Sequence, residues 1–355
     1  MPLTANLTEE RLRALDPGNM LGMTLELPQQ IERGLKLGRE FARSHALRKL
    51  DEVDWMGLGG SAVAGDLLQA FGCEPPTLPL GLRVLRSPRP TTAARLVCSY
   101  SGNTVEALHA FEEVPPDRIW FSISSGGKLM EMARKAKVPH LTLPSGYPPR
   151  AAVGFTLGAM FSIFEAVYGV RLAELADVLA RLVEDAKRYR KLDAESNAAL
   201  ELAVKFVDRT PVIYAVDGLT MPAVAFRMRA QLAENSKVWS HAFELPEMAH
   251  NEVESFAHLA QVLPPPLVIF LGSHSQDSRA ADPRPGLRNL LDDFRIRHVT
   301  LDPAEIWDAA LSRIEAGLRT MLLLDAATVY LAVLKAVNPL EIPIITKLKK
   351  LSAGN

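Results

Sequence analysis

Cysteine is scarce in this sequence, since Cys73 and Cys98 are the only two among 355 residues. Two cysteines cannot form the dense disulfide framework of small secreted domains. No CxxC pair appears, and the eight histidines show no spacing that gathers metal ligands. We therefore interpret both cysteines as small buried residues and expect neither a metal nor a cofactor.

Net charge and long apolar runs are also lacking. Forty basic residues against 41 acidic ones leave a formal net charge of -1, which does not indicate nucleic acid or an anionic membrane as a partner. The N-terminus has no basic start followed by an apolar run, and no later segment approaches the roughly 20 uncharged apolar residues of a membrane span. We expect a cytoplasmic protein without membrane contact, which binds small phosphate groups locally.

The chain has enough apolar residues for more than one hydrophobic core. It is 48% hydrophobic, and its length exceeds what one domain usually organises. Between Val53 and Leu143, β-rich runs alternate with stretches of helical periodicity, such as Ser61 to Phe71. This alternation predicts a parallel sheet with crossover helices.

A second alternation of the same kind follows a helical stretch from Arg150 to about Lys191. It leads into a long helix or helix pair from Ala304 to Val337, which a proline breaks before a short lysine-rich helix. The sequence thus predicts an α/β protein of two similar domains. We place the first at residues 1–165 with a helical extension, the linking helix at 166–195, and the second at 196–355.

Glycines follow the first predicted strand directly, and a helix opens at once. Glycines let backbone N–H groups approach an anion at a helix N-terminus, so Gly59, Gly60 and Ser61 are candidate phosphate ligands. The spacing also resembles a dinucleotide fingerprint, but its third glycine is misplaced and the expected acidic residue is missing. A purely structural tight turn is the other alternative.

Three hydroxyls and a glycine crowd a second strand-to-helix turn. Ser99, Ser101 and Thr104 are more than helix capping requires, because one serine or threonine satisfies an N-cap. Together they suit a phosphate with three acceptor oxygens, helped by the helix dipole. A third turn, Ser124 to Lys128, is either a further ligand loop or a solvated turn.

These turns resemble those of the sugar isomerase (SIS) domain superfamily. The motifs Gly57–Asp66, Ser99–Leu108, Pro149–Ala152, Glu234–Lys237, Pro246–Glu252 and Tyr330–Ala332 together resemble the bifunctional phosphoglucose/phosphomannose isomerase family. The resemblance implies two SIS-type domains, each a parallel sheet flanked by helices in a flavodoxin-like sandwich. It also implies a homodimer that interconverts glucose 6-phosphate, and also mannose 6-phosphate, with fructose 6-phosphate.

The resemblance further implies roles for four side chains. Glu234 corresponds to the family's catalytic carboxylate, and Arg150 to the arginine that faces a negative enediolate. His250 and Lys335 correspond to the residues that assist opening of the sugar ring. The alternatives are an exposed helix-end glutamate, a helix-start salt bridge, a core histidine and a surface lysine.

Thr328 is similar in position to the threonine associated with mannose 6-phosphate in that family. It precedes Lys335 by two helical turns and is predicted to share its face. A small hydroxyl there would leave room for the enediolate to rotate about C2–C3. The expected acceptance of the second aldose depends on this one residue.

Three competing functions remain open from the residues. A non-catalytic phosphosugar sensor would need the phosphate turns without Glu234, His250 and Lys335, and the chain shows no basic helix-turn-helix segment. Another SIS-type enzyme, such as an amino-sugar isomerase or deaminase, would share the turns. A metal-dependent mannose 6-phosphate isomerase would need clustered histidines. The loop from Ser273 to Gly286 carries two arginines whose role the sequence does not define.

Overall fold

The computed structural model describes residues 7–72, 81–170, 172–216, 220–259, 261–262, 264–273 and 282–353. These residues form two compact units. We call Glu26–Glu184 the N-terminal unit, and the described parts of Met1–Leu25 and Asp185–Asn355 the C-terminal unit.

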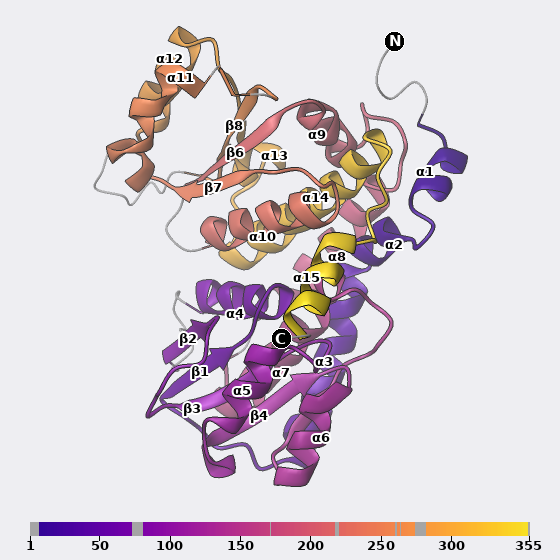
Figure 1. Ribbon diagram of the computed structural model, residues 1–355, viewed down its shortest axis with the longest axis vertical. Coiled ribbons are helices and arrows are strands. Elements are labelled where there is room, and N and C mark those ends of the chain that lie inside the picture. Colours follow the sequence, from indigo (N-terminus) through magenta and orange to yellow (C-terminus); the bar gives the residue numbers. More distant parts are fainter. Residues whose placement is uncertain are drawn as a thin grey trace. The chain divides into compact units, whose positions relative to one another are not determined.

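A five-stranded parallel sheet forms the centre of the N-terminal unit (Figure 1), in the order β2-β1-β3-β4-β5. Its strands are β1 Glu52–Met56, β2 Gly81–Leu85, β3 Ala94–Cys98, β4 Ile119–Ser124 and β5 His140–Thr142. This is the strand order of a flavodoxin-like sheet, and each strand lies in one of the β-rich runs of the sequence. The predicted α/β fold class is confirmed.

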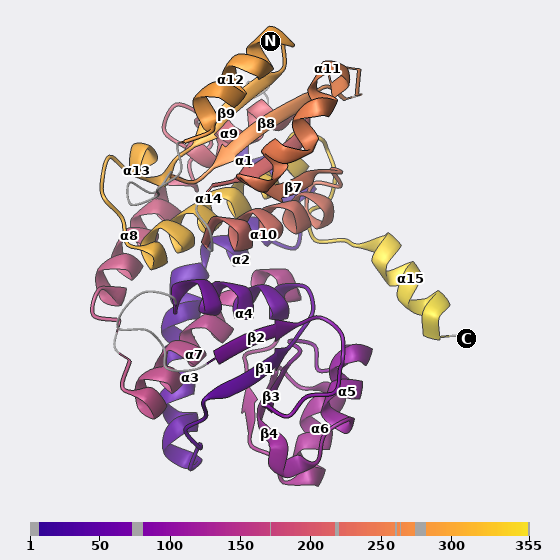
Figure 2. The same cartoon turned by 90° about the vertical axis from the view of Figure 1, so that its left-hand side faces the viewer.

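Helices cover both faces of this sheet (Figure 2). On one face, Phe121 of β4 contacts Phe41 with ring centroids 5.2 Å apart, and Trp55 of β1 packs against Gly65. On the other face, Val97 of β3 joins a hydrophobic cluster with Ala107. The first layer comprises α3 Leu27–Ser44, α4 Gly60–Phe71 and α7 Val153–Tyr168, and the second comprises α5 Val105–Glu112 and α6 Gly127–Ala136.

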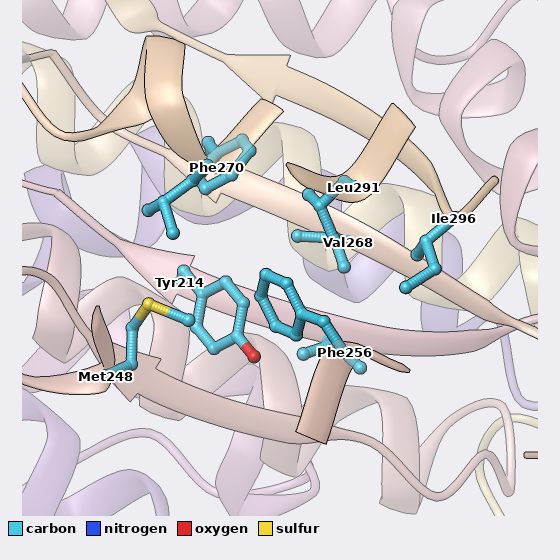
Figure 3. Close-up of a cluster of buried hydrophobic side chains, with 9 residues drawn as sticks. Tyr214, Met248, Phe256, Val268, Phe270, Leu291 and Ile296 are labelled. Carbon is cyan, nitrogen blue, oxygen red and sulfur yellow. The ribbon is translucent and has the colours of Figure 1, made fainter. Parts of the chain in front are cut away.

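The C-terminal unit contains a second parallel sheet, in the order β7-β6-β8-β9. Alternate residues of β6 and β8 point into a hydrophobic cluster beneath α11 and α12. Figure 3 shows Tyr214 and Phe270 of this cluster, whose ring centroids lie 6.3 Å apart. The strands are β6 Thr210–Ala215, β7 His241–Glu244, β8 Pro266–Leu271 and β9 Arg297–Leu301.

The remaining helices complete the two units. They are α1 Glu9–Leu15, α2 Met20–Leu25, α8 Leu175–Arg188, α9 Ala198–Phe206, α10 Thr220–Glu234, α11 Phe256–Leu259, α12 Arg284–Asp293, α13 Pro303–Ile306, α14 Arg313–Leu334 and α15 Pro343–Ala353. Four 3₁₀ turns add η1 Pro116–Arg118, η2 Pro149–Ala151, η3 Glu247–His250 and η4 Glu252–Ser255. The predicted helix or helix pair after Ala304 is therefore two helices, α13 and α14.

The division into units differs from the predicted domain bounds. The prediction placed residues 1–165 in the first domain, whereas residues 7–25 belong to the C-terminal unit because α2 packs against α14. The division after Glu184 falls inside α8, within the segment predicted to link the domains.

Helix α14 is the central helix of the C-terminal unit. It is long and apolar enough to cross a membrane, which the sequence analysis did not recognise, but 94% of its apolar window is buried inside the protein. Asp325 of α14 forms a bidentate ion pair with Arg227 of α10, and its Oδ2 lies 2.7 Å from the Arg227 Nη2. Burial raises the pKa of Asp325 and Arg227 lowers it. Burial is the larger cause and the pKa is raised overall, so the ion pair offsets only part of the desolvation cost at the α10–α14 contact.

Cys98 is buried at the end of β3, in agreement with the sequence interpretation. Burial raises the pKa of its thiol to about 12, so the thiol is protonated at neutral pH. Cys73 lies outside the described residues.

The buried ion pair leads to a prediction about stability. We expect Asp325→Ala to lower the free energy of unfolding by about 3–5 kcal/mol, because it leaves the Arg227 guanidinium buried without its carboxylate. The double variant Arg227→Met/Asp325→Leu should lose less than the single variant. Urea unfolding measures both, with Glu201→Ala in the exposed Glu201–Lys205 pair as a control expected to change by about 0.5 kcal/mol or less. Equal losses for Asp325→Ala and the control would contradict the assignment.

Candidate functional site

Two turns lie at the carboxyl ends of neighbouring strands in the N-terminal unit. One connects β1 to α4, and the other connects β3 to α5. In the order β2-β1-β3-β4-β5 the chain reverses direction across the sheet between β1 and β3. Open α/β sheets bind ligands at this switch point, outside the carboxyl ends of the strands. The fold therefore places both sequence-predicted phosphate turns where a ligand is expected.

The first turn presents backbone. Gly59 is the N-cap of α4 and is exposed, with φ +53, and a Cβ added there would meet no described atom within 4 Å. Gly60 is closely packed instead, because its Cβ would lie 2.8 Å from the carbonyl oxygen of Pro149. The start of α4 thus has an open side at Gly59 and a side that contacts η2 at Gly60.

Ser61 joins the two turns. Its Oγ accepts a hydrogen bond of 3.2 Å from the backbone N–H of Tyr100, and its side chain also contacts the Cys98 thiol. Only 7% of Ser61 is exposed. The sequence analysis named Ser61 as a candidate phosphate ligand, and in the structure its hydroxyl holds the second turn against the first.

The second turn leaves the start of α5 without a side-chain cap. Thr104 is the N-cap residue, yet its hydroxyl lies 2.9 Å from the Ser99 Oγ, and no described side chain caps the helix. The first N–H groups of a helix need partners, and the dipole favours an anion there. Ser101 is exposed on the same turn and accepts the Asn103 N–H at 3.3 Å. A phosphate at this position could accept hydrogen bonds from the Ser101 hydroxyl, from one hydroxyl of the Ser99–Thr104 pair and from backbone N–H groups.

The third turn supports the second. At the start of α6, the N–H of Lys128 donates to Asn103 Oδ1 at 3.1 Å, and that of Leu129 donates to the Gly102 carbonyl at 2.9 Å. The Ser125 N–H donates to the Tyr100 carbonyl at 2.8 Å. The amides of this turn therefore bind the neighbouring turn, a structural role that neither interpretation from the sequence included.

Arg150 lies in η2, immediately after Pro148 and Pro149. It is 4% exposed, and the close approach of Gly60 to Pro149 fixes this segment beside the first turn. Gln30 of α3 donates to the Ala151 carbonyl at 2.7 Å and holds the segment from the other side. The structure thus places the backbone of Arg150 next to the start of α4 and buries its side chain.

In the C-terminal unit, Glu234 is the last residue of α10 and is partly exposed. The two residues after it are fully buried and tie this end of α10 to α14. Asn235 Nδ2 donates to Thr328 Oγ1 at 2.9 Å, and Ser236 Oγ donates to the Thr328 carbonyl at 2.6 Å. The position of Glu234 is therefore set by the contact between the two helices.

Lys237 connects the ends of α10 and α14. Its ammonium donates to the carbonyl oxygens of Glu234 at 2.8 Å, Asn235 at 3.2 Å and Asn338 at 2.6 Å. Lys335, the exposed C-cap of α14, lies three residues before Asn338. Two of the predicted catalytic residues, Glu234 and Lys335, thus lie on segments joined at one end of the C-terminal unit.

Thr328 differs from its predicted environment. It has no exposed surface, and its hydroxyl donates to the Asp325 carbonyl at 2.7 Å while accepting from Asn235. The sequence analysis expected it to share an accessible face with Lys335 and to contact the substrate. The structure shows a helix-contact residue, because position 328 faces α10 and Lys335 lies at the helix end.

His250 is exposed at the end of η3. The residues around it are held by Glu252, whose carboxylate lies 2.9 Å from His241 Nε2 and accepts the Tyr214 hydroxyl at 3.0 Å. Burial is the main cause of a raised pKa at Tyr214, so this hydroxyl stays a donor. The HNE motif therefore combines an exposed histidine with a carboxylate that anchors it to β6 and β7.

The loop from Ser273 to Gly286 is described only in part. Arg284 is 8% exposed and forms ion pairs with Asp282 at 2.8 Å and Asp302 at 3.5 Å, so it stabilises the fold. Arg279 lies outside the described residues. Among the described residues, no three histidine, cysteine, aspartate or glutamate side chains gather in a group that could hold a metal.

Comparisons with known proteins find relatives along most of the chain. Residues 195–351 match the model of the bacterial phospho-glucose isomerase C-terminal SIS domain. A bifunctional phosphoglucose/phosphomannose isomerase of Caldicellulosiruptor bescii is 29% identical over 93% of this chain and 98% of that protein. The one of Aquifex aeolicus is 30% identical over 71% of this chain and 73% of that protein.

This chain belongs to the bifunctional phosphoglucose/phosphomannose isomerase family. The resemblance stated from the sequence motifs is thereby confirmed. The fold agrees, because the structure of a hypothetical protein of Thermus thermophilus superimposes with a TM-score of 0.72 at 16% identity, covering 98% of this chain and 94% of that one.

Gly59 and Gly102 allow a test of whether the start of α6 supports the turn from Ser99 to Thr104. Gly59 and Gly102 both have positive φ, +53 and +66, but a Cβ at Gly102 would lie 1.8 Å from the Gly126 carbonyl oxygen. We expect Gly59→Ala to lower the free energy of unfolding by about 1–2 kcal/mol through its φ alone. Gly102→Ala should lose a further 1–3 kcal/mol or so from the clash. Equal losses in urea unfolding would show that the third turn does not constrain the second.

Proposed function

We propose that this protein interconverts glucose 6-phosphate, and also mannose 6-phosphate, with fructose 6-phosphate. The observation that carries the proposal is the uncapped start of α5, with the Ser99–Thr104 hydroxyl pair, at the switch point of the sheet. Membership of an isomerase family supports the choice of substrate class. The open backbone at Gly59 supplies a second approach to the phosphate.

Glu234 carries the proton transfer in this proposal. Its carboxylate takes the proton from C2 of the open-chain aldose, the C–H electrons form a C1–C2 double bond, and the C1 carbonyl oxygen becomes negative. Transfer of the C2 hydroxyl proton to the C1 oxygen, and return of the proton from Glu234 to C1 as the double bond shifts to C2=O, give the ketose. The turn of Asn235 to Lys237 fixes the carboxylate for these transfers.

Arg150 stabilises the enediolate, and His250 with Lys335 opens the sugar ring. A guanidinium is always charged, so it can offset the negative charge that develops on oxygen without a proton transfer of its own. Ring opening moves a proton from the C1 hydroxyl to the ring oxygen, which suits an exposed imidazole near neutral pH. The exposure of both His250 and Lys335 supports access to substrate.

Acceptance of mannose 6-phosphate needs no second set of catalytic groups. Glucose 6-phosphate and mannose 6-phosphate differ only at C2 and yield the same enediolate. Thr328 would influence the isomerisation of both aldoses through Asn235, because its buried hydroxyl holds the turn that carries Glu234. We further propose a homodimer in the cytoplasm, which the family resemblance supports.

The proposal predicts loss of both activities in one variant. Glu234→Gln preserves shape but removes the base, and we expect kcat to fall roughly 10²–10⁴-fold for glucose 6-phosphate and mannose 6-phosphate alike. Fructose 6-phosphate formation is measured in the presence of chelator, where the wild type should keep full activity. Glu201→Gln, on the exposed face of α9, is the matched control and should behave as wild type.

Other outcomes distinguish the alternatives. Full activity in Glu234→Gln would remove the proton-transfer role. A wild type inactive on both aldoses but active on glucosamine 6-phosphate would indicate another SIS-type enzyme. Binding without any turnover would indicate a sensor.

Thr328 gives a second prediction. Thr328→Val keeps the shape but cannot hydrogen-bond Asn235, and we expect kcat to fall about fivefold on both aldoses, because one buried hydrogen bond is worth roughly 1 kcal/mol. Thr328→Ser should retain activity. A loss confined to mannose 6-phosphate would instead support direct control of enediolate rotation at this position.

A further inference from the structure

A histidine that the mechanism does not use is hydrogen-bonded at both ring nitrogens in the N-terminal unit. His140 of β5 lies with Nδ1 2.8 Å from Ser122 Oγ and Nε2 3.0 Å from Ser124 Oγ. Both serines belong to β4 and have no exposed surface. The three side chains share the face of the sheet that α5 and α6 cover, since Ser122 pairs in register with Val97.

The donors and acceptors available in these side chains fix which atom donates in each hydrogen bond. Ser124 Oγ donates its one proton to the Gly126 carbonyl at 2.7 Å and accepts the Gly126 N–H at 3.1 Å. It can therefore only accept from His140, so Nε2 carries the proton. Nδ1 of the neutral ring is then an acceptor, and Ser122 donates to it. Burial lowers the pKa of His140 to about 4, in agreement with a neutral ring.

This series of hydrogen bonds ends at Gly126, which supports the turn from Ser99 to Thr104. The Gly126 carbonyl that accepts from Ser124 is the group that packs against Gly102, the glycine at the centre of the second turn. The next residues, Gly127 to Leu129, open α6 and hold Asn103 and the Gly102 carbonyl. His140 thus fixes the position of Gly126 through Ser124. Gly126 in turn packs against Gly102 in the turn from Ser99 to Thr104.

We propose that His140 is a positioning residue for the phosphate group, acting as a neutral donor–acceptor pair that orients Ser124, Gly126 and, through them, the turn from Ser99 to Thr104. The inference rests on the proposed phosphosugar function. His140 itself touches neither reacting atoms nor phosphate in this role. Its contribution is to substrate affinity, not to the proton transfers.

Two variants of His140 separate positioning from filling of space. His140→Phe keeps an aromatic ring but removes both hydrogen bonds. His140→Gln restores an acceptor and a donor on one planar group. His109→Gln, at an exposed histidine of α5, is the matched control. The measurements are the affinity for inorganic phosphate by calorimetry, KM and kcat for glucose 6-phosphate, and the melting temperature.

We expect His140→Phe to weaken phosphate binding and to raise KM roughly fivefold to tenfold, as loss of about one hydrogen bond implies, with kcat within about twofold of wild type. His140→Gln should recover most of the affinity. Unchanged phosphate affinity and KM in His140→Phe would overturn the inference, as would equal losses in both variants or a loss in kcat alone.

Failure of the proposed function remains distinguishable from failure of this inference. A wild type that binds phosphate without isomerising sugars would reject the proposed reaction, and the affinity comparison of the two variants would still decide the role of His140. A wild type that binds no phosphate would overturn the inference together with the phosphate turn.

Discussion

The central constraint in this structure is the way the turn from Ser99 to Thr104 is held. Thr104 occupies the N-cap of α5, but its hydroxyl pairs with Ser99, so the helix start keeps amide groups for a ligand. The missing side-chain cap costs this helix start about 1 kcal/mol. The amides of α6, Ser61 and the packing of Gly102 on Gly126 supply the missing support. The proposed phosphate site thus depends on contacts with the neighbouring turns.

In the C-terminal unit, side-chain hydrogen bonds hold the end of α10 in place. Its predicted proton-transfer residue, Glu234, stands at a helix end, where carbonyl groups lack partners in the helix. The Lys237 ammonium donates to the Glu234 carbonyl at this end, and the side chains of Asn235 and Ser236 fasten it to Thr328 of α14. The buried Arg227–Asp325 pair fixes the same two helices further along. The Glu234 carboxylate, which the proposed reaction needs to be accessible, is therefore held at the contact between α10 and α14.

The sequence predicted the alternation of strands and helices well, because parallel strands such as Phe121–Ile123 are continuously buried and their helices show clear periodicity. The glycine and hydroxyl turns were found because their composition exceeds what capping needs. The role of Ser61 and the burial of Thr328 could not be predicted, since both depend on which distant segment packs against them. The role of His140 could not be predicted, because its contacts with two serines of another strand depend on the strand register. The position of residues 7–25 also depended on a long-range contact with α14.

A crystal structure of the protein with glucose 6-phosphate tests the account most directly. The account predicts phosphate density at the carboxyl ends of β1 and β3, with phosphate oxygens accepting from the first amides of α5 and from the hydroxyls of Ser99 and Thr104. Phosphate bound elsewhere, with the start of α5 still open, would contradict it.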